Sequence, residues 1–72
     1  MAKTRQVLHL VDQGKEYMVI RHFGVAANPY RIYHLYRTWG EDNRPHDHKV
    51  CVEKYGNLAS CFYWFLQNNI GY

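Results

Sequence analysis

The sequence predicts a small α+β fold, in which an antiparallel meander of three to four strands carries one C-terminal amphipathic helix on one face. Runs rich in β-branched and aromatic residues alternate with short stretches of turn residues, which is typical of strands joined by tight connections. The apolar residues of the C-terminal segment then switch to the spacing of a helix. The chain has 72 residues, a length that favours a single small domain covering residues 1–72.

Four extended segments are expected, at residues 6–12, 16–23, 30–39 and 48–55. The first two are joined by residues 12–15, where Gly14 accepts the positive φ that a tight hairpin turn requires. In the fourth segment, alternation places Cys51 and Glu53 on the same face of the sheet.

The final segment, residues 57–69, carries the signals of a helix. Asn57 is a suitable N-cap, because its side-chain oxygen can accept a hydrogen bond from an amide two or three residues later. The predicted buried face is centred on three apolar residues, Leu58, Phe62 and Phe65. Trp64 then falls on the exposed side, where an indole is either covered by another segment or marks a dimer or partner contact.

Alternation divides the third predicted strand into two faces. One face carries Tyr30, Ile32, His34, Tyr36 and Thr38. The other face carries Arg31, Tyr33, Leu35, Arg37 and Trp39. We expect the first face to lie under the helix, with Ile32 and Tyr36 buried, and the second face to remain open.

The open face has the composition of a contact surface. Arginine, tyrosine and tryptophan are enriched at the centres of binding interfaces, so the predicted partner-binding residues are Arg31, Tyr33, Arg37, Trp39 and Trp64. The alternative interpretation is a solvated sheet face, on which arginines and aromatic rings stabilise the sheet as cross-strand pairs.

Composition limits the possible classes of protein. Aromatic residues make up 17% of the chain, which is too many for a disordered segment. The net charge of +3 permits an anionic partner without requiring one. No apolar run approaches the roughly 20 residues of a membrane span, so we expect a cytoplasmic protein without a membrane partner.

Cys51 and Cys61 are too few for a disulfide scaffold, although one bridge can form between them if they lie close together.

Motifs for catalysis and metal binding are weak. His46 and His48 point the same way in an extended segment, but no further pair supplies the four ligands of a closed zinc site, so a solvated turn is favoured. Cys51 and Cys61 lack an identifiable base. We therefore expect a protein that is not an enzyme and has no cofactor.

Two functions remain. The favoured one is a protein-interaction module, either a homodimer or an inhibitor-type protein that acts on a larger partner through the aromatic and arginine-bearing sheet face. The alternative is a nucleic-acid-binding module, whose basic face would comprise Arg21, Arg31, Arg37 and Lys49 if the second, third and fourth strands adjoin in that order. The order of strands and helix over residues 16–69 resembles, in outline, the sheet-plus-helix DNA-binding arms of some integrases and transcription factors. A continuous positive stripe on the open face would favour nucleic acid, and a neutral apolar patch would favour protein.

Overall fold

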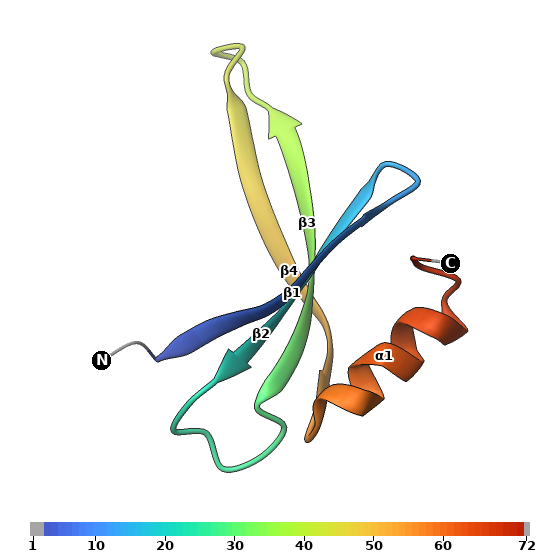
Figure 1. The fold of residues 1–72 in the computed structure, drawn as a ribbon. Coiled ribbons are helices and arrows are strands. Elements are labelled where there is room, and N and C mark those ends of the chain that lie inside the picture. The colour runs from blue at the N-terminus through green and yellow to red at the C-terminus, as the bar shows by residue number, and fades with distance from the viewer. Residues whose placement is uncertain (1–2, 72) are drawn as a thin grey trace.

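The computed structural model describes residues 3–71 and contains one four-stranded antiparallel sheet with one helix packed on it (Figure 1). The elements in chain order are β1 (Thr4–Asp12), β2 (Lys15–His22), β3 (Tyr30–Trp39), β4 (Pro45–Tyr55) and α1 (Leu58–Gln67). The sheet order is β1-β2-β3-β4, so every strand pairs with its neighbour in sequence. The predicted α+β meander is confirmed. Over this described range, no helix combines the length and the apolarity that crossing a bilayer requires.

The β1–β2 hairpin closes through the two-residue turn that the sequence predicts. Asp12 pairs with Lys15, and the two residues between them, Gln13 and Gly14, have φ values of 51° and 77°. Positive φ at both central positions matches the right-handed twist of the flanking strands. The register of the hairpin is therefore set by its turn.

The sheet is strongly twisted, so the tips of the β1–β2 and β3–β4 hairpins point in different directions (Figure 1). The tip of the β3–β4 hairpin lies away from α1. Pairing between β2 and β3 stops at Glu16 and Leu35, whereas β3 and β4 stay paired to Trp39 and Pro45. We call this two-stranded extension, residues 36–39 and 45–48, the arm. Tyr36 lies in the arm and is 44% exposed, so the expectation that it is buried is wrong.

Each edge strand contains a β-bulge. The register shifts between Gln6 and Leu8 in β1, and β4 has one extra residue, Val52, opposite the step from Ile32 to Tyr33. A bulge breaks the alternation of side chains. Cys51 therefore pairs with Tyr33 while Glu53 pairs with Ile32, so the two lie on opposite faces, contrary to the prediction from alternation.

The core lies between α1 and the sheet. Val19 and Ile32, which pair across β2 and β3, are fully buried, as is Cys61 of the helix. Phe65 is 2% exposed, and its ring meets Tyr17 edge-on at 5.9 Å between centroids. Leucines of β1 and the tyrosines at the start of β3 and the end of β4 close the margins.

Both ends of α1 are capped. The Asn57 side chain accepts a hydrogen bond from the Ser60 amide at 2.9 Å, which confirms the predicted N-cap. At the other end the amides of Asn69 and Ile70 donate to the carbonyls of Leu66 and Phe65, and Asn69 has a φ of 56°. This is the Schellman arrangement, in which the residue after the left-handed position makes an apolar contact. Ile70 is accordingly buried in the core.

The rotation of α1 about its axis differs from the predicted one. Its buried side is centred on Cys61 and Phe65, whereas Phe62 is 45% exposed. Trp64 is half-buried and its ring packs edge-on against Tyr17 and Phe65, so it is not the exposed indole that the sequence predicts. The helix contains no charged residue, so its sequence does not mark which side faces water.

Candidate functional site

We call the sheet face remote from α1 the open face. It carries the β3 residues that alternation predicts for it. Ile32 lies under the helix, so its neighbours along β3 project the other way. Arg31, Tyr33, Arg37 and Trp39 therefore share the open face, joined by their β4 partners across the sheet. Those β4 partners are Lys54, Cys51, Asp47 and Pro45.

Tyr33 is buried although it lies on the open face. Its side chain is 8% exposed, and the Lys49 ammonium lies 5.1 Å from its ring centroid. Its hydroxyl lies 2.9 Å from Nε2 of His22 on β2. The covered ring leaves little area for a partner, so the predicted contact residue Tyr33 supports the Lys49 ammonium instead.

Three cations lie near His22, the residue that contacts the Tyr33 hydroxyl, and we call them the cationic cluster: Arg31, Lys49 and Lys54. None of the three has an ion-pair partner among residues 3–71. The pKa of His22 is lowered, first by desolvation and then by the positive charges of these same three side chains. The Nε atom of Arg31 is buried without a hydrogen-bond partner in the described part of the chain. The arrangement concentrates positive charge and leaves donor capacity unused.

The distal part of the open face is partly neutralised. Arg37 Nε donates to Asp47 Oδ1 at 2.7 Å, and this hydrogen bond lowers the pKa of the carboxyl and raises that of the guanidinium. Beyond this pair, Trp39 is 64% exposed. An open groove of about 750 Å³ lies between the β1–β2 turn and the arm, and Arg37, Asp47 and Lys49 line one of its walls.

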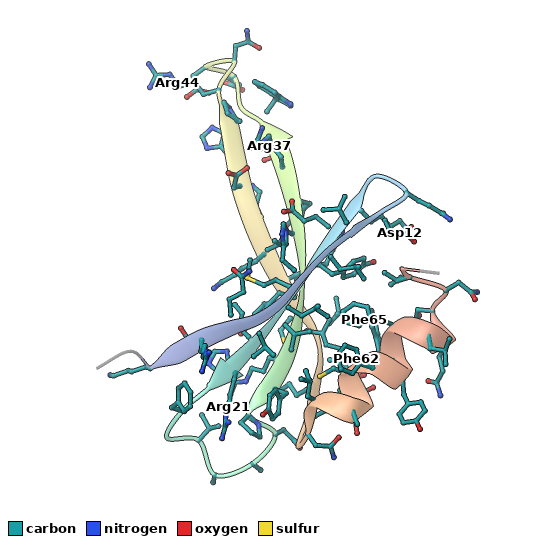
Figure 2. The ribbon with its side chains drawn as sticks, viewed as in Figure 1. Asp12, Arg21, Arg37, Arg44, Phe62 and Phe65 are labelled. Atoms are coloured by element: carbon teal, nitrogen blue, oxygen red, sulfur yellow. The ribbon has the colours of Figure 1, made fainter. Side chains whose placement is uncertain are left out.

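Arg21 does not belong to this face, so the predicted basic set is wrong at that position. It pairs with Tyr30, which packs against the core, and its guanidinium lies 5.4 Å from the Tyr30 ring centroid and 5.0 Å from that of Phe23. Figure 2 shows Arg21 near the β2–β3 connection and Arg37 at the other end of the sheet, on the arm.

Lys54 was missed by sequence reasoning. Lys49 lies on the open face, and strict alternation from it would send Lys54 to the helix side. The extra residue Val52 reverses the phase, so Lys54 pairs with Arg31 and joins the cluster. No residue type in this alternating run signals a bulge at Val52.

The two histidines with metal-ligand character lie in strand β4, not in a turn. His48 stacks on Tyr36 at 5.0 Å between ring centroids, with its Nε2 2.8 Å from Thr38 Oγ1. His46 contacts Asp42 in the connection between β3 and β4. Within the described range, no three histidine, cysteine or acidic side chains are grouped so as to hold a metal ion.

The cysteines are free thiols in different surroundings. Cys61 lies in the core under α1, where desolvation raises its pKa to about 11, so it stays protonated at neutral pH. Cys51 lies on the open face opposite Tyr33, and its Sγ contacts the Glu53 carbonyl. The sheet separates the two, so a bridge between them does not fit this fold.

Comparison with known proteins adds no assignment: no family model, curated protein or solved structure matches the chain.

Proposed function

We propose that this protein binds nucleic acid through the open face of β3 and β4. The observation that carries the proposal is the cationic cluster, whose members lie close enough to lower the pKa of His22 and have no carboxylate partner in the described structure. Phosphates supply the charge that such a cluster lacks, and they accept the hydrogen bonds that unpaired guanidinium and ammonium groups offer.

The basic residues form a stripe of useful length. The open face of β3 and β4 carries four basic residues and one acidic residue, Asp47. Arg31 and Arg37 are six residues apart on β3, which corresponds to about 20 Å of strand. A nucleic-acid strand of that length has roughly six phosphates, at about 3.4 Å of rise each. The stripe can therefore follow a phosphate backbone.

The mode of recognition follows from burial. Because the Tyr33 ring is covered, it cannot serve as a platform for an unstacked base. The exposed ring on this face is Trp39, at the end of the arm. We therefore expect phosphate contacts to dominate, with weak dependence on base sequence and strong dependence on salt.

The test removes two cations from the cluster and compares the result with a matched removal elsewhere. Lys49→Gln combined with Lys54→Gln should weaken binding to an oligonucleotide and reduce the slope of log K against log salt by about 1 to 2, because each lost phosphate contact removes about 0.9. All the substituted residues are exposed, so folding is retained.

The control is Arg5→Gln combined with Lys15→Gln, which removes the same charge. Arg5 pairs with Arg21 on the helix side, and Lys15 lies at the β1–β2 turn. This variant should keep the wild-type slope within about 0.5. Equal losses in the two double variants, or no binding by wild-type protein at low salt, would refute the proposal. Binding to polyglutamate as tight as that to the oligonucleotide would instead identify an acidic protein as the partner.

An intracellular, reducing location is part of the same proposal. Nucleic acid is available there, and both cysteines are unpaired. Protein interaction, which the sequence favours, would use a different surface, the outer side of α1, where Phe62 and Leu66 are exposed.

A further inference from the structure

Beyond Leu35, β3 continues into the arm without a strand on its β2 side. The last pair between the two strands joins Leu35 to Glu16, whereas β3 runs on to Trp39. The β1–β2 hairpin points away from the arm here (Figure 1), and the open groove of about 750 Å³ lies between the two. We call the side of residues 36–39 that faces this groove the free edge, since no strand of the described structure pairs with it.

The backbone of the free edge offers unused hydrogen-bonding groups. Gly40 uses its amide and its carbonyl within the connection between β3 and β4. The backbone groups of successive residues in an antiparallel strand point to alternate sides. Those of Arg37 and Trp39 therefore point away from β4, into the free edge. Trp39 pairs with Pro45, which has no N–H, as fits a pair that exchanges no hydrogen bonds across the arm.

The other two edges of the sheet are protected against pairing. On the outer edge of β4, the outward-directed backbone belongs in part to Pro45, which lacks a donor, and to Lys49, whose charge opposes strand addition. The other edge strand, β1, is interrupted by its bulge. The free edge carries tyrosine, threonine and tryptophan, which favour strands. Its one charged residue, Arg37, is neutralised by Asp47.

The free edge is complementary to itself in one register. A two-fold axis through Thr38, perpendicular to the sheet, lays the free edges of two copies antiparallel. Arg37 of each copy then pairs with Trp39 of the other, and both backbone hydrogen bonds of each pair form. An axis through Arg37 would pair Trp39 with Leu35, which already has a partner in β2. An axis through Trp39 would pair Arg37 with Glu41, which lies beyond the strand.

This register also brings suitable side chains together. On the open face, the Trp39 indole, which is 64% exposed, lies opposite a guanidinium of the other copy, and such a pair gains from a cation–π contact. On the opposite face, Thr38 adjoins its own copy, and threonine pairs stabilise antiparallel strands. Gly40 lies opposite Tyr36 of the other copy, whose ring can cover the bare backbone of a glycine. The groove beside Gly14 provides the room for this approach.

We infer that two copies of the protein dimerise by pairing their free edges, which continues the sheet from one copy into the other. In strand addition the affinity comes from backbone hydrogen bonds, and the side chains select the partner. A second copy is selected because it presents an arginine to each tryptophan in the register that the backbone requires. The paired segment is short, and stable interfaces bury about 800 Å² on each partner, so the dimer dissociates on dilution.

Dimerisation in this register leaves the proposed nucleic-acid surface free. An axis perpendicular to the sheet keeps the open faces of both copies on the same side. The two cationic clusters then lie on one continuous face, with Arg31 of each copy about 23 Å along β3 from the axis. The inference does not depend on nucleic-acid binding, because it rests on the backbone and side chains of the arm.

The test combines sedimentation equilibrium with amide hydrogen exchange of the full chain, from low micromolar to millimolar concentration and without nucleic acid. As the dimer forms, the amides of Arg37 and Trp39 should exchange more slowly. The amides of Asp47 and Lys49, on the outer edge of β4, are the internal control and should keep their rates. A wild-type protein that remains monomeric throughout would overturn the inference, and equal slowing at both edges would overturn the choice of edge.

Loss of one backbone donor tests the hydrogen bonds. Trp39→Pro removes the indole and the N–H, whereas Trp39→Thr removes the indole and keeps the N–H. Because this N–H points away from β4, both variants keep the pairing within the arm, which a circular dichroism melt verifies. Trp39→Pro should dimerise at least about tenfold more weakly than Trp39→Thr, since each copy loses a donor. Equal association of the two variants would show that the free edge is not the interface.

A cysteine at the two-fold axis tests the register, in a chain whose partly exposed native thiol is removed by Cys51→Ser. Thr38→Cys should form an intermolecular disulfide with a mild oxidant, because residues directly opposite each other place their Cβ atoms close enough for one. His46→Cys, on the same face but on β4, is the control and should remain reduced. Equal cross-linking of the two variants would contradict the register.

A different occupant of the free edge has its own outcome. If the wild-type protein stays monomeric and a peptide of alternating valine and threonine shifts the amide signals of Arg37 and Trp39, the occupant is an extended segment of another protein. That result would overturn the dimer.

Discussion

At the residue scale, the environment of His22 combines the charge and the packing of the open face. Its imidazole lies 2.9 Å from the Tyr33 hydroxyl, and Tyr33 supports the Lys49 ammonium. Desolvation and the three neighbouring cations lower the pKa of this histidine from its ordinary 6.5. Neutral His22 is therefore part of the structure at neutral pH, and its protonation would add a fourth positive charge to the cationic cluster.

This lowered pKa predicts how stability changes with pH. Below about pH 6.5 the unfolded chain takes up a proton at His22 more readily than the folded chain does. The contribution of His22 is therefore complete above that pH and declines as pH falls toward the lowered folded pKa. In urea unfolding at pH 7.5 and at pH 5.5, His22→Gln should show a smaller loss of stability on acidification than wild type does. A variant as pH-sensitive as wild type would show that other groups account for the loss.

At the element scale, α1 depends on its two ends because it has ten residues and no internal ion pair. A helix this short is marginal by itself, so its capping and its packing hold it in place. Asn57 caps the first turn, and the Schellman turn at the other end places Ile70 in the core.

Asn57→Ala removes the N-cap and should lower the free energy of unfolding by about 1 kcal/mol. The effect follows from the loss of the acceptor for the Ser60 amide and hydroxyl, which lie 2.9 Å and 3.0 Å from Asn57 Oδ1. Gln67→Ala, at an exposed helical position, is the control and should change stability by less than about 0.5 kcal/mol. Equal effects of the two substitutions in denaturant unfolding would contradict the role of the cap.

The elements differ in how well their sequence predicts them. The strands, the turn at Gly14 and the cap at Asn57 follow from local chemistry, and each is where the sequence places it to within a few residues. The bulge at Val52 and the rotation of α1 do not follow, because they are decided by contacts across the sheet. A helix with apolar residues on nearly every side has two possible buried faces. In this fold, packing against the sheet buries Cys61 and leaves Phe62 exposed.

The bulge and the strand register account for what the sequence missed in the candidate site. The bulge determines the face of Lys54, and the strand register places Arg21 beside Tyr30 on the helix side. Arg31, Arg37 and Lys49 were predicted correctly to share a face, because β3 and the distal part of β4 alternate without interruption.

At the scale of the whole molecule, the two sides of the sheet are specialised. One side is closed by α1 over the core, and the other carries the cationic cluster, of which Lys49 lies over the buried Tyr33 ring. The molecule is 40 × 34 × 15 Å in extent, so it is a thin layer with a large surface for its size. The proposed nucleic-acid contact would use one of the two broad surfaces of this layer, the open face.

The most direct measurement of the central claim is a titration of isotope-labelled protein with a short oligonucleotide at low salt, followed by amide and side-chain NMR shifts. We predict that the changes concentrate at Arg31, Lys49 and Lys54, that the His22 pKa rises as phosphates offset the neighbouring charges, and that added salt reverses both effects. No shift at low salt, or shifts confined to α1, would contradict the account.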